Sequence, residues 1–253
     1  MISSGEGPAI ARERLVLALD VATLDEATEL AERLRPWFSV VKIGLELFSA
    51  EGPLAVDTFL DEGFRVFLDL KLHDIPTTVQ RAARRIGALG VSYATVHAAG
   101  GGGMLRAAVD GFEEGWATAV ENGHPSPPMR SAGVLAVTVL TSESDAGADL
   151  VGRRASLAAR SGCLGVVCAA SDLLVVAARA PELVTAVPGI RLSGSSPDDQ
   201  ARVAGPSAAI RAGADLLVIG RTVTAAASPE AAAAQLSEEV LAGLAPAAAP
   251  NGL

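Results

Sequence analysis

The chain has 253 residues, half of them hydrophobic, which is enough to bury one sizeable core as a single domain. Its 29 acidic and 20 basic residues give a formal net charge of -9, and such a surface disfavours nucleic-acid binding because it repels phosphates. The two cysteines, Cys163 and Cys168, are too few for a disulfide scaffold and form no Cys-x-x-C motif, so we expect two packed thiols.

We do not expect the first residues of the chain to form a targeting signal. Glu6, Pro8 and Glu13 precede the first apolar run, which argues against a signal peptide, and no apolar run is long enough to span a membrane. We therefore expect a cytoplasmic protein with no membrane partner. Residues 1–13 are expected to form a short extension before the folded domain.

After this extension, short β-branched runs alternate with stretches of helical periodicity. The runs are continuously apolar, as expected for a parallel sheet covered by helices. The predicted strands are Arg14–Leu19, Val40–Ile43, Phe64–Asp69, Tyr93–His97, Leu135–Val139, Gly165–Cys168, Glu182–Val187 and Asp215–Ile219. The predicted helices are Leu24–Leu34, Pro53–Glu62, Pro76–Leu89, Gly102–Glu114, Asp149–Ser161, Asp172–Ala180, Ser207–Ala212 and Pro229–Leu241. Eight such units favour a closed (β/α)8 TIM barrel over an open doubly wound sheet.

Two segments interrupt this rhythm. Residues 116–130 form an insertion that holds Pro125, Pro127 and Pro128 and has no periodicity. The tail at residues 245–253 is rich in Pro and Ala and is expected to fray. Neither segment is typical of a domain boundary, so residues 1–253 are predicted to form a single domain.

Polar residues follow nearly every predicted strand, at the end where barrels of this kind carry their active sites. They are Asp20, Lys42, Asp69 with Lys71, His97, Thr141 with Ser142, Arg191 and Arg221. The densest group is F-L-D-L-K-L-H-D-I-P-T-T at residues 67–78. Asp69 and Lys71 are two residues apart, so in an extended strand both project into the barrel mouth, where opposite charges keep each other ionised. The spacing alone leaves open a purely structural ion pair.

A second group lies near the end of the barrel. The long loop at residues 187–205 contains several glycines, and I-G-R-T at Ile219–Thr222 ends the eighth strand. Loops after strands seven and eight form the usual phosphate site of such barrels, and Arg221 and Gln200 supply polar contacts there. An ordinary flexible loop is the alternative. No cluster of histidines and carboxylates indicates a metal site.

At these residues the sequence resembles the orotidine 5′-phosphate decarboxylase family. The shared motifs, in the order of the family, are L-A-L-D at Leu17–Asp20, V-K-I-G at Val41–Gly44, D-L-K-L-H-D-I-P-T-T at Asp69–Thr78, V-T-V-L-T-S at Val137–Ser142, P-G-I-R at Pro188–Arg191, D-Q at Asp199–Gln200 and V-I-G-R at Val218–Arg221. The resemblance covers roughly residues 14–225. It implies a homodimer that decarboxylates orotidine 5′-phosphate to UMP with no cofactor and no metal, in the last step of de novo pyrimidine nucleotide synthesis.

The resemblance also implies a role for each matching residue. Lys71 would protonate C6 of the pyrimidine within a group of Asp and Lys side chains that it forms with Lys42, Asp69 and Asp74 of the partner subunit. The implied substrate-binding residues are Asp20 and Lys42 at the ribose with Thr78 of the partner subunit, Thr141 and Ser142 at the pyrimidine, and Arg191, Gln200, Gly220 and Arg221 at the phosphate.

Two other functions remain open from the sequence. A metal-assisted phosphosugar lyase on the same barrel pairs the motif aspartate with a second acidic residue on Mg²⁺, whereas Lys42 here would repel the metal. A non-catalytic nucleotide-binding protein on a decayed barrel is expected to lose Lys71 first. A turnover assay that follows loss of the orotidine chromophore separates the three functions.

Overall fold

Eight parallel strands form a closed barrel in which each strand pairs with the next and β8 pairs with β1. The structure is a computed structural model that describes residues 7–124, 132–140, 147–192 and 204–245. The strands are β1 (Leu15–Leu19), β2 (Val40–Ile43), β3 (Arg65–Leu72), β4 (Tyr93–His97), β5 (Gly133–Val137), β6 (Gly165–Val167), β7 (Val184–Val187) and β8 (Leu216–Ile219). The predicted (β/α)8 barrel is confirmed.

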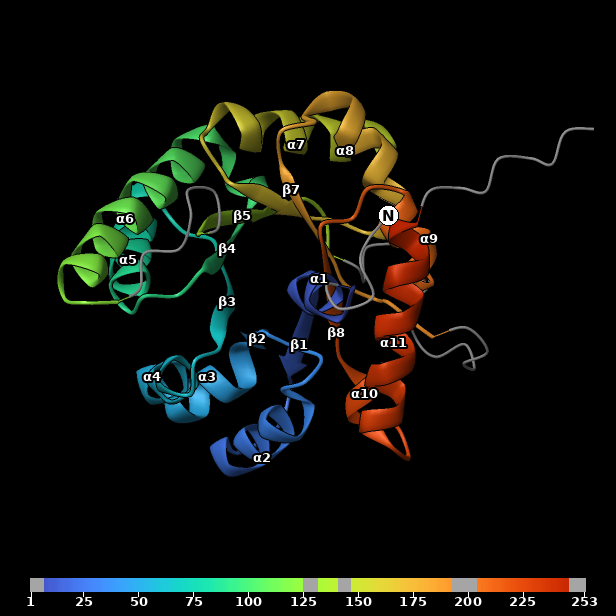
Figure 1. Cartoon of the computed structure of the whole chain (residues 1–253). Coiled ribbons are helices and arrows are strands. Elements are labelled where there is room, and N and C mark those ends of the chain that lie inside the picture. Colours follow the sequence, from blue (N-terminus) through green and yellow to red (C-terminus); the bar gives the residue numbers. More distant parts are fainter. Residues whose placement is uncertain (1–6, 125–131, 141–146, 193–203, 246–253) are drawn as a thin grey trace, which may run out of the picture.

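Helices surround the strands on the outside of the barrel (Figure 1). They are α1 (Gly7–Arg14), α2 (Leu24–Leu34), α3 (Leu45–Glu51), α4 (Pro53–Asp61), α5 (Pro76–Ala88), α6 (Gly101–Glu121), α7 (Ala148–Arg160), α8 (Leu173–Arg179), α9 (Pro206–Arg211), α10 (Arg221–Thr224) and α11 (Pro229–Leu244), with short 3-10 turns at Ala98–Gly100 and Ala170–Asp172. Several of these helices begin at a capping residue or at a proline, as is usual for helix starts. Thr23 and Ser228 accept from backbone N–H groups as N-caps of α2 and α11, and Pro76 opens α5.

The core has two layers, because alternate residues of each strand face the barrel interior and the helices. The inner layer holds side chains such as Val40, Phe67, Tyr93 and Leu216, and the rings of Phe67 and Tyr93 pack edge to face with centroids 5.7 Å apart. The outer layer joins strands to helices. It includes both cysteines, whose thiols are free, and burial raises the pKa of each to about 12. The interior of the barrel is thus filled by packed side chains.

Two segments are more regular than the sequence suggested. Most of the expected N-terminal extension forms α1, which buries Ala11 and lets Arg12 donate to the carbonyls of Arg35 and Phe38. The expected insertion begins inside a helix, because α6 continues to Glu121. Residues 125–131 and 246–253 lie outside the described part of the chain.

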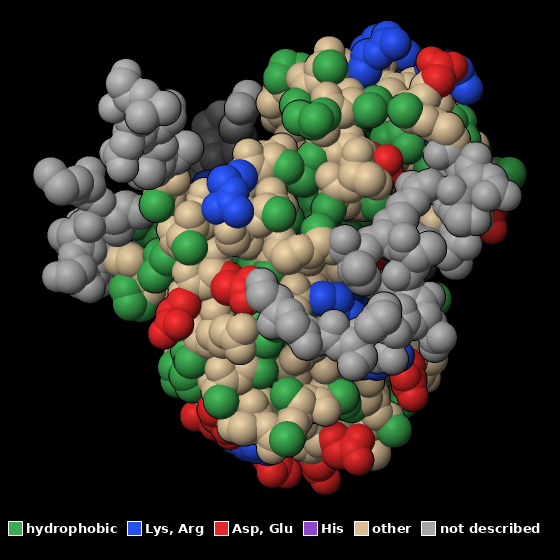
Figure 2. All heavy atoms as spheres, turned by 90° about the vertical axis from the view of Figure 1, so that its right-hand side faces the viewer, with side chains coloured by type: hydrophobic (Ala, Val, Ile, Leu, Met, Phe, Trp, Pro, Cys, Tyr) green, Lys and Arg blue, Asp and Glu red, His purple; other side chains and the backbone are tan. Residues whose placement is uncertain are grey.

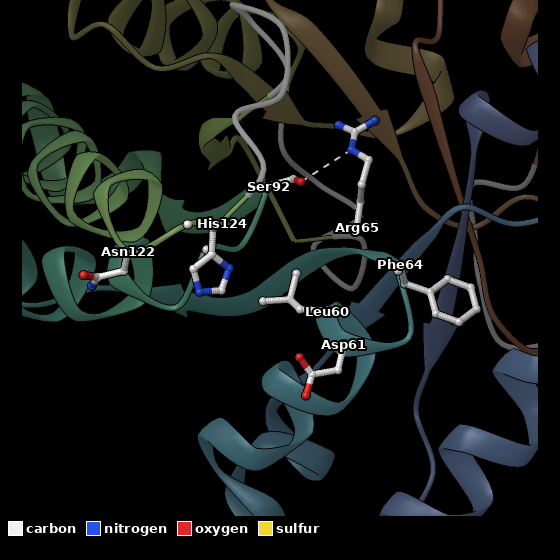
Figure 3. A pocket seen from close by; sticks show the side chains of 10 residues that line it. Leu60, Asp61, Phe64, Arg65, Ser92, Asn122 and His124 are labelled. Carbon is white, nitrogen blue, oxygen red and sulfur yellow. Dashed lines mark hydrogen bonds between the residues drawn. The ribbon is translucent and has the colours of Figure 1, made fainter.

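A hollow of about 500 Å³ opens at the amino-terminal end of the barrel, between the end of α4, the start of β3 and the turn after α6 (Figure 3). The Arg65 side chain points toward Ser92 there and donates to its Oγ at 3.4 Å. The Arg65 guanidinium also bonds to the Tyr93 hydroxyl and lies over the Tyr93 ring. These contacts hold Arg65 at the amino-terminal end of the barrel. Active sites of such barrels lie at the opposite, carboxyl-terminal end.

The outer surface agrees with the acidic composition. Acidic side chains gather along the lower edge of the face shown in Figure 2, whereas basic side chains are scattered over that face. None of the helices in the described ranges is both long enough and apolar enough to cross a membrane.

Candidate active site

Four charged side chains converge at the carboxyl-terminal ends of the first three strands. Asp20 follows β1, Lys42 lies in β2, and Asp69 and Lys71 lie in β3. The Lys42 Nζ lies 3.1 Å from Asp20 Oδ1 and 3.5 Å from Asp69 Oδ2, and the Lys71 Nζ lies 2.9 Å from the same Asp69 oxygen. One carboxylate oxygen therefore lies between two ammonium groups. We call these four residues the charged array.

The electrostatics of the array centre on Asp69. Lys42 and Asp69 are 8% and 9% exposed. Burial alone raises the pKa of Asp69, but the charges of Lys42 and Lys71, with hydrogen bonds from Lys71 and Thr95, outweigh it and hold that pKa below its ordinary value. Asp69 is therefore ionised at neutral pH, and the array places its negative charge directly beside the Lys71 Nζ.

The backbone that presents the array is not a regular strand. The register of β3 with β4 pairs Leu68 with Ala94 and then Leu72 with Val96, so two extra residues bulge between these pairs. Lys71 has a φ of 51°, which lies in the left-handed region that residues other than glycine rarely adopt. The expectation that Asp69 and Lys71 meet is correct, but the extended strand assumed as its reason is wrong.

Two residues to which the sequence analysis gave no role support the array. Thr95 on β4 is 1% exposed, and its hydroxyl donates to Asp69 Oδ1 at 2.9 Å. Gly44 follows β2, where a Cβ would lie 3.1 Å from Asp20 Oδ1 and 3.3 Å from Lys42 Nζ, so its missing side chain leaves room for the ion pair. Gly44 could have been found as the residue two positions after Lys42. Thr95 could not, because its role depends on the strand pairing.

Two adjoining hollows open at this end of the barrel. The lysine pocket is lined by Lys42, Asp69 and Lys71 together with apolar side chains, and the arginine pocket is lined by Asp20, Arg191, Gly220 and Arg221 among others. The two share Pro188 and Val218 as lining residues. A ligand of moderate length could therefore occupy both pockets at once.

The arginine pocket joins the loops after β7 and β8. Arg191 donates to Thr222 Oγ1 at 3.1 Å, and the Thr222 hydroxyl donates to the Ile190 carbonyl at 2.6 Å. Arg221 is the first residue of α10 and is exposed. The structure thus brings together the predicted Arg191, Gly220 and Arg221, and Thr222 orients Arg191 in a way that the sequence did not reveal.

The remaining predicted site residues fall into two groups. Asp74 and Thr78 are exposed on the segment of residues 73–78, which leads from β3 into α5, and the Asp74 carboxylate accepts the N–H of Ile75. The ion pairs found for Lys42 and Lys71 in the described part of the chain are with Asp20 and Asp69, not with Asp74. Thr141, Ser142 and Gln200 lie outside the described residues.

A closed barrel whose strands carry a charged array centred on the buried Lys42 and Asp69 at their carboxyl-terminal ends defines an enzyme of the (β/α)8 class. In the described ranges no group of three or more His, Cys, Asp and Glu side chains is arranged to hold a metal ion. Residues 13–236 match the model of the orotidine 5′-phosphate decarboxylase / HUMPS family. The chain belongs to this family.

Relatives and solved structures agree with this assignment over nearly the whole chain. An orotidine 5′-phosphate decarboxylase of Anaeromyxobacter sp. (strain K) is 45% identical over 232 residues, which cover 87% of this chain and 95% of that protein. One from Moorella thermoacetica is 42% identical over 91% of this chain and 93% of its own length. The crystal structure of orotidine 5′-phosphate decarboxylase from Lactobacillus acidophilus superposes with a TM-score of 0.74 at 30% identity and covers 90% of this chain and 99% of that chain.

Proposed function

We propose that this chain is a carboxy-lyase that converts orotidine 5′-phosphate to UMP and CO₂, the last step of de novo pyrimidine nucleotide synthesis. The observation that carries the proposal is the adjacency of two pockets, one with a charged array and one with two arginines. Such a pair suits a nucleotide whose reacting carboxylate and phosphate lie at opposite ends. The names and coverage of the relatives support the same substrate.

The chemistry requires fixed charge rather than a cofactor. When the bond from C6 to the carboxylate breaks, CO₂ leaves and its bonding electron pair stays in an sp² orbital of C6 that the ring delocalises poorly. In the absence of an electron sink, the protein must supply preorganised positive charge at that point. Lys71 would stabilise the developing charge and then transfer a proton from Nζ to C6, which completes UMP. Asp69, held ionised by Lys42 and Lys71, would lie beside the substrate carboxylate and favour its departure.

The remaining contacts would bind the parts of the substrate that do not react. Arg191, Gly220 and Arg221, with Gln200, would hold the phosphate. Asp20 and Lys42 would contact the ribose hydroxyls, and Thr141 and Ser142 would contact the pyrimidine edge. The phosphate lies far from C6, so its binding energy would organise the reacting end rather than stabilise the ground state alone.

The active form would be a homodimer. The segment of residues 73–78, which follows β3, is exposed and carries Ile75, which is 67% exposed. The family resemblance implies a homodimer in which Asp74 and Thr78 reach the site of the partner subunit, and both residues lie exposed on this segment. We infer that this segment packs against a second copy of the chain and delivers Asp74 and Thr78 to the site there.

Both the substrate and UMP are charged nucleotides that do not cross membranes unaided, which supports a cytoplasmic location.

The test is a turnover assay on protein that has been exhaustively treated with a chelator. We expect loss of the orotidine chromophore and stoichiometric UMP, at the same rate before and after chelation. Activity that disappears on chelation and returns with Mg²⁺ would favour the metal-assisted lyase. Tight nucleotide binding without turnover would favour a non-catalytic binding protein.

A further inference from the structure

One buried hydroxyl connects the two catalytic groups of β3. Thr95 Oγ1 lies 2.9 Å from Asp69 Oδ1, to which it donates, and 2.9 Å from the backbone nitrogen of Lys71, from which it accepts. The Lys71 Nζ in turn bonds the other oxygen of the same carboxylate. The residues Thr95, Asp69 and Lys71 therefore form a closed ring of three hydrogen bonds.

The backbone of β3 explains why the hydroxyl is needed. Regular pairing with β4 stops at Leu68 and resumes at Leu72, so the Lys71 N–H falls within the bulge and is satisfied by the Thr95 side chain. Lys71 also holds a left-handed φ of 51°, a strained conformation that persists only where its surroundings enforce it. The bulge directs the Lys71 side chain to Asp69, and Thr95 is the neighbouring-strand group that holds the bulge.

We propose that Thr95 is a positioning residue of the decarboxylation, which fixes the Asp69 carboxylate and the Lys71 backbone relative to each other. This inference rests on the proposed function. Without the hydroxyl, Asp69 Oδ1 loses a donor and the Lys71 N–H loses its acceptor, so the ammonium no longer has one fixed position. Nucleotide binding should be little affected, because Arg191 and Arg221 are carried by the loops after β7 and β8.

Three variants separate positioning from simple stability. Thr95→Val keeps the shape of the side chain and removes the hydroxyl, whereas Thr95→Ser keeps the hydroxyl. Thr185→Val is the matched control. Thr185 is also a buried barrel threonine, and its hydroxyl likewise accepts a backbone N–H and donates to a carboxylate, both of Asp215, but at the amino-terminal end of the barrel.

We expect Thr95→Val to lower kcat by about 10- to 100-fold, the cost of a misplaced reacting group, while the Kd for UMP stays near that of the unchanged protein. Thr95→Ser should recover most of the turnover. Thr185→Val should lower the melting temperature and leave kcat unchanged. The proposal is overturned if Thr95→Val keeps full kcat, if the serine variant is impaired as strongly as the valine variant, or if UMP binding weakens in proportion to kcat.

A second readout needs no turnover. Carboxyl ¹³C NMR should give a higher pKa for Asp69 in Thr95→Val than in Thr95→Ser, because the hydroxyl stabilises the charged form, and Lys71 amide exchange should be faster. If the unchanged protein fails to decarboxylate orotidine 5′-phosphate, the proposed function fails while these two measurements still test the role of Thr95. Equal pKa values and equal exchange rates in the two variants would overturn that role.

Discussion

The chain contains only two lysines, Lys42 and Lys71, and both lie in the charged array, whereas every other basic residue is arginine. Arginine keeps its proton at all ordinary pH values, so it provides charge but does not act as a proton donor. Lysine is therefore found only where a basic group touches the buried Asp69. This distribution supports a proton-transfer role for at least one of the two.

Substitution of Lys71 tests that role directly. Lys71→Ala should nearly abolish kcat, and Lys71→Arg should do so as well although it keeps the positive charge, because the guanidinium does not release a proton. UMP binding, measured by calorimetry, should survive in part in both variants. If either variant kept more than about a tenth of kcat, less than about 1.4 kcal/mol of barrier would be involved, and Lys71 would not be the acid.

The phosphate end allows an independent prediction. Arg221→Ala should strongly lower kcat/KM for orotidine 5′-phosphate and hardly affect the nucleoside that lacks the phosphate, because the lost contact is to the phosphate alone. Thr222→Val is a graded control, since it removes only the hydroxyl that orients Arg191 and should cost less. Equal losses on nucleotide and nucleoside would show that Arg221 acts on the fold or on the chemistry.

Some contacts among these residues could be predicted from the sequence, and others could not. The two-residue spacing of Asp69 and Lys71 correctly indicated that they meet, since neither an extended strand nor a bulge separates them far. The bulge itself, the left-handed Lys71 and the Thr95 contact depend on how β3 pairs with β4, which spacing within one segment does not encode. The role of Thr222 is hidden for the same reason, because it joins two loops.

At the scale of elements, an unusually close helix contact supports the segment that carries Asp74. α5 begins at Pro76, directly after this segment, and packs along α6. A Cβ built on Gly111 would overlap the Gln80 carbonyl, and one on Gly115 would overlap the Arg84 carbonyl. These glycines let the two backbones touch. The contact fixes the position of α5 and with it the segment of residues 73–78.

Gly115→Ala is therefore expected to destabilise the protein by about 1–3 kcal/mol, the usual cost of overpacking. Gly103→Ala is the matched control in the same helix, because a Cβ there meets nothing within 4 Å, and it should stabilise by up to about 1 kcal/mol. Urea unfolding of both variants measures the difference. Equal free energies of unfolding would mean that the two helices move apart at no cost.

Most elements were predictable because they have a clear apolar pattern, and the exceptions lack one. In α3 only Leu47 is buried, so seven residues show no apolar stripe. In α1 only Gly7 and Ala11 are buried, so this helix shows no apolar stripe either. Arg12 anchors it instead, by a hydrogen bond to the Arg35 carbonyl. The end of α6 was assigned to the insertion because the prolines that follow it obscured the helical period.

At the scale of the whole molecule, the two ends of the barrel differ in kind. The amino-terminal end carries structural polar contacts, in which Arg65 bonds to Ser92 and Tyr93 and Arg14 pairs with Asp215. The carboxyl-terminal end carries the charged array, the arginine pocket and the exposed segment of residues 73–78. Structural polar contacts and candidate catalytic contacts are thus separated along the barrel axis, and the surface expected to be shared between subunits adjoins the second group.

This arrangement predicts that each active site is built from two chains. Asp74 is exposed, and the ion pairs described for Lys71 leave it outside the array of its own chain. In a two-fold dimer each chain would give its Asp74 to its partner and receive one in return. Lys71→Ala and Asp74→Ala proteins should each be nearly inactive alone.

When the two variants are mixed in equal amounts and allowed to exchange subunits, half of the dimers should be hybrids. In each hybrid one site carries both lesions, while the other combines an intact Lys71 with an intact Asp74. About a quarter of all sites should therefore recover activity, by symmetry counting alone. Subunit exchange is verified separately by native mass spectrometry of isotope-labelled chains. A mixture that stays inactive despite proven exchange would mean that Asp74 serves its own chain, because only a shared site is restored by pairing two different lesions.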